Sequence, residues 1–194
     1  MSADLTKTEL RRRAVAVRDD LAARHGDIGE RLVLAFASRV LLKPPRTIAG
    51  YAPTRSEVNP MPLMSFLDAA GWCCSLPVVV DTQEGLVFRA WHEGDSLMPG
   101  TFGVRVPETR AEAVRPDIVL VPLLAYDEAG HRLGYGAGCY DRALAHLRRT
   151  GGVLAVGLAY AGQRVASLPA QAHDQLLDLL VTEEGVTEFG KTGL

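Results

Sequence analysis

The sequence predicts an α/β fold in which one open, mostly parallel sheet is flanked by helices on both faces, as three layers. Segments with helical periodicity alternate along the chain with short apolar, β-rich runs, and the connections between them are short. No internal repeat, low-complexity segment or linker interrupts the 194 residues. Residues 1–194 are therefore expected to form a single domain.

The N-terminal part predicts two helices, over about residues 7–42, that pack on the sheet. Thr6 is expected to cap the first helix and Gly26 to end it. The second helix is expected over about residues 27–42, before Pro44. Its apolar stripe consists of Ile28, Leu32, Phe36 and Val40.

The rest of the chain alternates between predicted strands, helices and loops. The β-rich runs are 47–51, 72–80 (with Pro77 as a break), 86–91, 117–126, 153–160 and 176–182, and 185–189 adds a terminal strand or small hairpin. Helices are expected over 60–70 and from about 139–141 to 149. The predicted loops are 53–59, 92–115 and 162–174.

The stretch 117–149 has the order of a phosphate-binding site. A buried strand and a turn are followed by Arg132, by glycines at 134, 136 and 138, and then by a helix. Glycines let backbone N–H groups approach an anion without a Cβ in the way. The helix N-terminus adds unpaired N–H groups and the positive end of its dipole.

Parallel sheets bind ligands outside the carboxyl ends of their strands, and three polar loops, 53–59, 127–138 and 162–174, are predicted there. This topology places Glu57, Arg132, Asp141 and Asp174 within reach of one crevice. Spacing alone leaves simpler roles open for the acids. Asp141 also suits the first turn of a helix, Asp174 a helix N-cap, and Glu57 a solvated loop.

Lys7 and Arg11 are four residues apart, so they share one helical face and can both reach a polyphosphate. Spacing alone leaves this pairing undecided. The run Arg11-Arg12-Arg13 is typical of a solvated helix face rather than of a nucleic-acid site.

Composition excludes several classes of protein. A net charge of −2 and a pI of about 6.2 argue against a nucleic-acid partner. No apolar run is long enough to span a membrane, and no secretory signal is expected. The three cysteines are odd in number and suit neither a disulfide framework nor a zinc site, which favours a cytoplasmic location.

Two glycine patterns are misleading. Residues 185–192 match the P-loop consensus, but a following helix is not expected, so this segment is interpreted as a frayed tail. A dinucleotide fingerprint starting at Gly134 requires a third glycine at position 139, where this chain has Cys139.

Several of these motifs together resemble a known family. They are Lys7-x-x-x-Arg11, a glutamate after the first strand, VPLLAYDEAGHRLGYGAGCYDRAL at 121–144, and LPAQAHD at 168–174. The combination resembles the 5-formyltetrahydrofolate cyclo-ligase family, also called methenyltetrahydrofolate synthetase, over about residues 7–186. The family's fold resembles the sugar-phosphate isomerase and CoA-transferase group, which agrees with the predicted sheet.

The resemblance implies a role for each matching residue. ATP is expected at Lys7, Arg11, Arg132, Leu133, Gly134, Tyr135, Gly136, Ala137, Gly138, Cys139 and Tyr140. The folate is expected at Ala52, Glu57, Tyr135, Gly136, Ala137, Gly138 and Cys139. Asp141 and Asp174 are the implied Mg²⁺ ligands, and Arg132 and Tyr140 are the implied catalytic residues. Two positions depart from the family pattern: Cys139 replaces a frequent tyrosine, and Val106 a usual glutamate.

The implied reaction is the ATP-dependent cyclisation of 5-formyltetrahydrofolate to 5,10-methenyltetrahydrofolate, with release of ADP and phosphate through a phosphorylated formyl intermediate. The expected assembly is a monomer or weak homodimer. Two alternatives remain open: a diverged relative that acts on another folate-like or small amide metabolite, and a non-catalytic folate- or nucleotide-binding module. A sugar-phosphate isomerase is suggested only by fold analogy.

Overall fold

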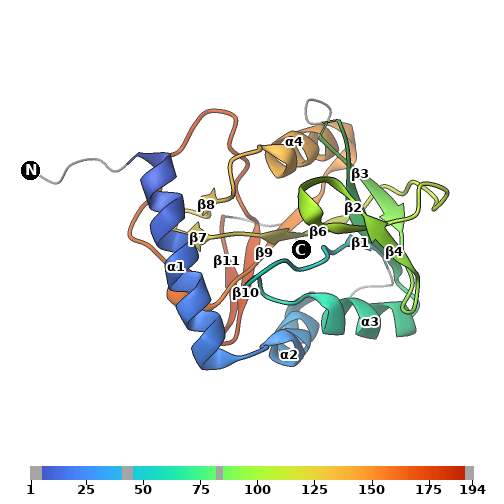
Figure 1. The fold of residues 1–194 in the computed structure, drawn as a ribbon, viewed down its shortest axis with the longest axis horizontal. Helices are drawn as coiled ribbons and strands as arrows, with labels where there is room; N and C mark the ends of the chain where they lie inside the picture. Colours follow the sequence, from blue (N-terminus) through green and yellow to red (C-terminus); the bar gives the residue numbers. More distant parts are fainter. Residues whose placement is uncertain (1–5, 41–45, 82–84, 191–194) are drawn as a thin grey trace, which may run out of the picture.

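The computed structural model describes residues 6–40, 46–81 and 85–190. Within them, seven strands form one sheet in the order β11-β10-β9-β6-β1-β2-β3. The five strands from β10 to β2 run parallel, and β11 and β3 are antiparallel edges. The predicted open, mostly parallel sheet is confirmed, with hairpins at both edges (Figure 1).

The strands of this sheet are short and their central members are buried. They are β1 (Thr47–Ala49), β2 (Cys73–Asp81), β3 (Gly85–Ala90), β6 (Ile118–Pro122), β9 (Leu154–Leu158), β10 (Leu179–Thr182) and β11 (Gly185–Glu188). Two small antiparallel pairs accompany it: β4 (Leu97–Pro99) with β5 (Arg105–Pro107), and β7 (Ala125–Tyr126) with β8 (Arg132–Leu133).

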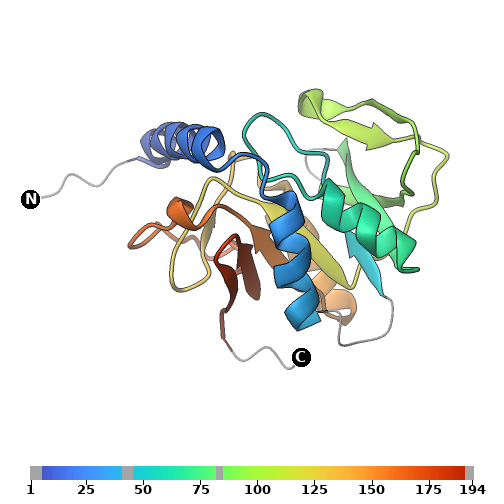
Figure 2. The same ribbon diagram turned by 90° about the horizontal axis from the view of Figure 1, so that it is seen from below.

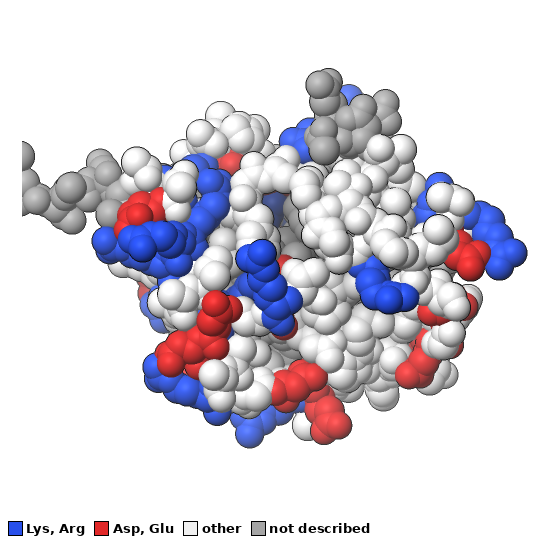
Figure 3. Space-filling model, in the orientation of Figure 1, with Lys and Arg blue, Asp and Glu red and all other residues white. Residues whose placement is uncertain are grey.

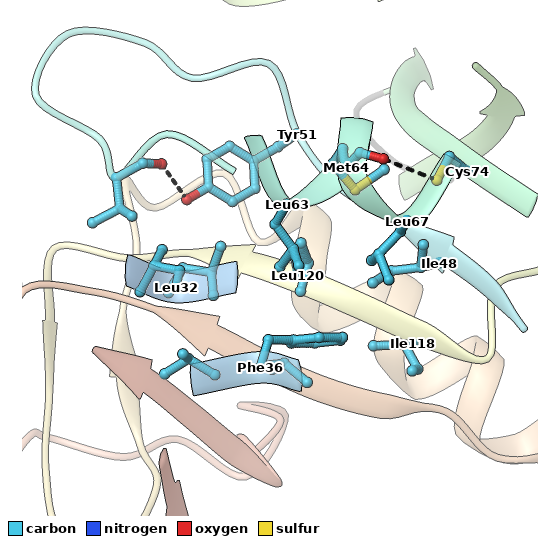
Figure 4. Close-up of a cluster of buried hydrophobic side chains, with 14 of the residues drawn as sticks. Leu32, Phe36, Ile48, Tyr51, Leu63, Met64, Leu67, Cys74, Ile118 and Leu120 are labelled. Carbon is cyan, nitrogen blue, oxygen red and sulfur yellow. Dashed lines mark hydrogen bonds between the residues drawn. The ribbon is translucent and has the colours of Figure 1, made fainter. Parts of the chain in front are cut away.

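Helices cover both faces of the sheet. α2 (Gly29–Val40) and α3 (Met61–Ala69) lie side by side on one face, and α4 (Cys139–Gly151) lies on the other (Figure 2). Leu32 and Phe36 of α2 pack with Leu63, Met64 and Leu67 of α3 over the strands (Figure 4). The second core lies under α4, around Leu144 and Leu147. The three predicted layers are therefore present.

The first helix, α1 (Lys7–His25), has the predicted ends. The Thr6 hydroxyl accepts from the Glu9 N–H at 3.3 Å, and Gly26 ends the helix at φ +65°. Arg12 and Arg13 are exposed as expected, and both donate to the Glu9 carboxylate, whereas Arg11 of the same run is half-buried. The predicted end of the second helix, at residues 41–45, lies outside the described residues.

The predicted strand 117–126 is corrected to two strands. β6 ends at Pro122, and Leu123 and Leu124 carry the chain to β7, which pairs with β8 instead of the main sheet. The apolar residues on both sides of Pro122 are buried in either case, so hydrophobicity could not reveal the break.

Two further predictions are corrected. Pro77 does not interrupt β2, because β1 pairs with β2 only up to Ser75 and leaves the proline beside the antiparallel β3 alone. The predicted loop 92–115 contains the β4–β5 hairpin, with the 3₁₀ turn η1 (Thr101–Gly103) at its tip. Val106, one of the two departures from the family pattern, lies in β5.

The C-terminal segment forms the predicted hairpin, although β10 starts only at Leu179. Gly185–Glu188 of the P-loop-like pattern is a β-strand, which rules out a phosphate loop there; Lys191 and Thr192 lie outside the described residues. Among the described helices, none is both long and apolar enough to cross a membrane.

Candidate functional site

Helix α1 crosses the carboxyl ends of three parallel strands. The Arg18 guanidinium donates to the carbonyl oxygen of Leu123, just after β6, and to the Ser56 hydroxyl in the loop after β1. At the end of the helix, the Tyr160 hydroxyl, two residues past β9, donates to Gly26 O at 3.3 Å. This edge is where a parallel sheet binds its ligands.

The glycine loop, residues 134–138, joins β8 to α4 beneath α1. Gly136 and Gly138 have φ of +105° and +67°, a left-handed region that favours glycine. Arg11 Nε donates to Gly134 O at 2.9 Å, and the Arg11 guanidinium would lie only 3.0 Å from a Cβ at Gly136. The loop is therefore shaped around a basic side chain from α1.

Gly134 differs from the other two glycines of the loop. Its φ lies outside the left-handed region, and a Cβ built on it meets nothing within 4 Å. The backbone thus requires glycine at positions 136 and 138 but not at 134, which the alternating pattern did not distinguish.

Arg132 is a largely buried cation of the site. Its side chain is 6% exposed and donates to Asp141 Oδ1 at 2.7 Å, while another nitrogen donates to Gln175 O. Burial lowers the pKa of the guanidinium, and the Asp141 carboxylate opposes that shift. Asp141 Oδ1 also accepts from Gln175 N at 2.9 Å, so one carboxylate ties α4 to the loop that carries Asp174.

Lys7, at the start of α1, reaches the same loop from the other side. Its ammonium nitrogen donates to Gln171 Oε1 at 2.9 Å and lies 3.5 Å from Asp174 Oδ2. Asp174 Oδ2 also accepts from Gln171 N, which closes a short turn. Hydrogen bonds and ion pairs thus link Lys7 to Asp174, Arg132 to Asp141, and Arg11 to the glycine loop between them.

Glu57 is buried in a tight turn after β1. Its carboxylate accepts from the N–H and the hydroxyl of Thr54 at 2.8 and 3.1 Å, and Arg55 adopts φ +53° within the turn. The side chain is 6% exposed, with Arg18 NH1 3.9 Å from Oε1. Burial raises the pKa of Glu57, and the Thr54 hydrogen bonds and Arg18 oppose the shift.

The remaining predicted residues lie around Glu57 and the loop. Burial and then the Glu57 charge raise the pKa of the Tyr140 hydroxyl, which lies in the first turn of α4. Cys139 is the buried first residue of α4, Ala52 is half-buried in the loop after β1, and Leu133 is buried in β8. Tyr135 is 47% exposed, and its hydroxyl accepts from Arg18 NH2 at 2.5 Å.

Two site residues were missed by the sequence analysis. Arg18 is 1% exposed and links the Glu57 turn to Tyr135; its spacing from Lys7 and Arg11 along one face of α1 is the pattern that could have revealed it. Asp127 is also buried, and its carboxylate accepts from the N–H groups of His131 and Leu168. It fixes the turn before Arg132 against the 162–174 loop.

The charge distribution agrees with an anion-binding edge. Lys and Arg side chains gather over the N-terminal half of α1, and a hollow with basic side chains at its rim opens between α1 and the part that carries α3 and β4 (Figure 3). Among the described residues, no group of three or more His, Cys, Asp or Glu side chains is placed to hold a metal ion.

Comparison with known proteins decides the family. The model of the 5-formyltetrahydrofolate cyclo-ligase family matches residues 3–183. The chain belongs to this family. Membership makes the protein a ligase of folate metabolism and confirms the family predicted from the motifs.

Individual relatives agree with this assignment. The chain is 35% identical over 147 residues to the 5-formyltetrahydrofolate cyclo-ligase of Mycolicibacterium smegmatis, covering 71% of this chain and 73% of that protein. Its identity to the Escherichia coli cyclo-ligase is 32% over 162 residues, covering 79% and 88%. The NMR structure of Aquifex aeolicus 5,10-methenyltetrahydrofolate synthetase superposes with a TM-score of 0.80 at 31% identity, covering 98% of this chain and 96% of that one.

Proposed function

We propose that this protein joins ATP and 5-formyltetrahydrofolate to give 5,10-methenyltetrahydrofolate, ADP and phosphate. Family membership supports the reaction, and one geometric observation supports its location. The glycine loop contacts Arg11 at Gly134 and, through Tyr135, the buried Arg18 beside Glu57. We call Lys7, Arg11 and Arg132 the cationic end of the site and the Glu57 turn its acidic end. The glycine loop contacts the cationic end directly and the acidic end through Arg18.

The cationic end is proposed to bind the ATP phosphates. Lys7 and Arg11 from α1 and Arg132 from β8 supply positive charge from two sides of the loop. Charge-assisted hydrogen bonds from such groups stabilise the negative charge that spreads over a transferring phosphoryl group. The N–H groups of residues 134–138 and the N-terminus of α4 are proposed to bind the same phosphates.

The acidic end is proposed to hold the folate. The Glu57 carboxylate is buried and fixed by Thr54, so it can accept hydrogen bonds from the pterin ring's N–H groups in one orientation. Tyr140, whose ring lies near this carboxylate, is proposed to stack against the folate or to hydrogen-bond to it. Ala52, in the same loop after β1, is proposed to line the folate site.

The chemistry must overcome a poor electrophile. The formyl nitrogen lone pair is delocalised into the carbonyl group, and the carbonyl oxygen is a poor leaving group. In the proposed sequence, the formyl oxygen attacks the γ-phosphorus of ATP and ADP leaves, which gives an N5-iminium phosphate. N10 then attacks the formyl carbon and loses its proton, the C–O bond breaks, and phosphate departs with that oxygen. The protein positions both substrates and balances charge without a covalent nucleophile.

Asp141 and Asp174 fit the requirements of Mg²⁺ together with ATP. Both carboxylates are about one quarter exposed and are fixed by Gln175 N and Gln171 N on the 162–174 loop and just after it. Mg²⁺ typically takes one or two carboxylates and completes its coordination with phosphate oxygens and water. When bound, the ion would neutralise phosphate charge; Lys7 and Arg132 hold the two carboxylates in place.

A direct absorbance assay with both substrates tests the proposal against the two alternatives. Near-UV absorbance of the methenyl product is expected to grow only when (6S)-5-formyltetrahydrofolate, ATP and Mg²⁺ are all present. ATP turnover with another amide but not with this folate would favour a diverged relative. Binding of both ligands without turnover by folded protein would favour a binding module.

We also propose a monomer or weak homodimer in a reducing, cytoplasmic setting. Cys73, Cys74 and Cys139 are unpaired, which suits such a compartment. Light scattering after size exclusion, across a range of concentrations, measures the assembly.

A further inference from the structure

Arg18 is buried in a way that needs explanation. It is the only member of α1 in the described chain that is fully buried, and its guanidinium sits among polar groups from three segments. Nε donates to Ser56 Oγ at 3.1 Å, NH1 to Leu123 O at 3.4 Å, and NH2 to Tyr135 OH at 2.5 Å. A charged side chain is almost never fully buried without such partners.

We propose that Arg18 is a positioning residue that holds the Glu57 turn and Tyr135 of the glycine loop together, and thereby sets the affinity for the folate. This inference rests on the proposed function. NH1 lies 3.9 Å from Glu57 Oε1, and the guanidinium carbon lies 5.6 Å from the centre of the Tyr135 ring. One cation thus contacts a residue assigned to the folate and a residue shared by the two ligands.

The second anchor of Arg18 strengthens the assignment. The Ser56 hydroxyl accepts from Arg18 and donates to Asp19, the next residue of α1. Ser56 directly precedes Glu57, so two neighbouring residues of α1 fix the backbone that presents the carboxylate. A merely structural arginine would not need to contact both Glu57, whose carboxylate is proposed to bind the folate, and the exposed Tyr135.

The groups that face Glu57 define the expected pH effect. Arg18 comes from α1, Arg55 from the turn itself, Tyr51 from the loop just after β1 and Tyr140 from α4. Arg18 and Arg55 are the cations among them and favour the ionised carboxylate. Removal of the Arg18 charge therefore raises the pKa of Glu57. As the pH is lowered, Glu57 is then protonated, and folate binding lost, at a higher pH than in the wild type.

The test compares Arg18→Met with Arg18→Lys, after turnover by the wild type has been established. Arg18→Met is expected to raise the KM for 5-formyltetrahydrofolate about tenfold or more, with a much smaller change in the KM for ATP. Its acid limb of kcat/KM for the folate is expected to move to higher pH. Arg18→Lys keeps the charge, so its KM rises while the acid limb stays near that of the wild type.

A double-mutant cycle with Glu57→Gln provides the decisive comparison. If Arg18 acts through the carboxylate, Arg18→Met costs much less folate affinity when it is combined with Glu57→Gln than when it is made in the wild type. Equal losses in both backgrounds, or a parallel rise of both KM values with an unmoved acid limb, would overturn the proposal. Absence of turnover by the wild type would instead contradict the proposed function.

A milder variant decides the matter if Arg18→Met does not fold. Ser56→Ala removes one anchor of the guanidinium and leaves every charge in place. It is expected to raise the KM for the folate about threefold or more at an unchanged KM for ATP. An unchanged KM for the folate in Ser56→Ala, measured on folded protein, would overturn the proposal.

Discussion

Arg132 and Asp141 form a 2.7 Å ion pair between β8 and the first turn of α4. The pair encloses the glycine loop, because its two members flank residues 134–138 in the sequence and meet in space. The cation proposed to face the ATP phosphates is therefore oriented by an acid proposed to face Mg²⁺. A change in either residue is expected to alter nucleotide binding through the other.

Asp141→Asn tests the metal assignment. The amide oxygen can still accept from Arg132 and Gln175, but the variant has no carboxylate for the ion and leaves the buried Arg132 charge unbalanced. We expect kcat to fall about 100-fold or more and stability by about 1–3 kcal/mol. Mg²⁺ is expected to strengthen ATP binding to the wild type but not to the variant, as measured by calorimetry.

Asp178→Asn is the matched control for this loss of charge. Asp178 pairs with Arg148 at 2.8 Å and has a similar exposure, 26% against 23% for Asp141. It should lose a comparable amount of stability while the effect of Mg²⁺ on ATP binding stays as in the wild type. An equal Mg²⁺ effect in both variants would mark Asp141 as a purely structural acid.

Arg132→Lys separates charge from geometry at the nucleotide end. Lysine keeps the positive charge but cannot donate to Asp141 and Gln175 O in the fixed fork of a guanidinium. We expect kcat/KM for ATP to fall about tenfold in Arg132→Lys and about 100-fold or more in Arg132→Ala. Initial rates at varied ATP concentration measure both, and unchanged ATP kinetics in Arg132→Ala would remove its phosphate role.

Gly136→Ala and Gly134→Ala form a matched pair within the loop. At position 136, φ is +105° and a Cβ would lie 3.0 Å from Arg11, so alanine is expected to destabilise the fold by about 1 kcal/mol or more and to displace Arg11. At position 134 a Cβ meets nothing within 4 Å, and alanine should change stability by less than about 0.5 kcal/mol. Thermal unfolding with and without ATP compares them; equal effects would contradict the loop geometry.

The free energy of unfolding of the wild type, relative to that of Glu57→Gln, is expected to decrease as the pH rises. Burial raises the pKa of Glu57 above its ordinary value of 4.5, so the folded state binds the proton more tightly than the unfolded chain does. The relative stability is therefore highest below pH 4.5 and declines as the pH rises through the raised pKa. Urea unfolding of both proteins between about pH 4 and 7 measures the difference. If the stability of the wild type relative to Glu57→Gln instead increased as the pH rises, the pKa of Glu57 in the folded state would be lowered, which would contradict the prediction.

Local signals made much of the fold predictable. Thr6 and Gly26 specify the ends of α1 through caps that depend only on neighbouring residues, and the apolar stripe of α2 is read from its period. The β4–β5 hairpin was missed because its three-residue strands carry little periodicity and because β5 packs against β2, which is distant in the sequence.

The site was predictable where a motif is continuous. Arg132, the loop glycines and Asp141 lie within ten positions, so sequence alone could place them together. The burial of Glu57 depends on α1, and Arg18 was missed because the inward face of α1 carries basic residues beside its apolar ones. Such a face normally indicates solvent, and only the Glu57 turn and Tyr135 reveal why it is buried.

Transfer of the formyl oxygen tests the central claim most directly. The substrate is prepared with ¹⁸O in its formyl group and turned over by the wild type with ATP and Mg²⁺, and the released phosphate is analysed by mass spectrometry. Attack of the formyl oxygen on the γ-phosphorus predicts that one ¹⁸O atom appears in each phosphate released. Phosphate without the label, formed while the methenyl product accumulates and the remaining substrate keeps its ¹⁸O, would contradict the account.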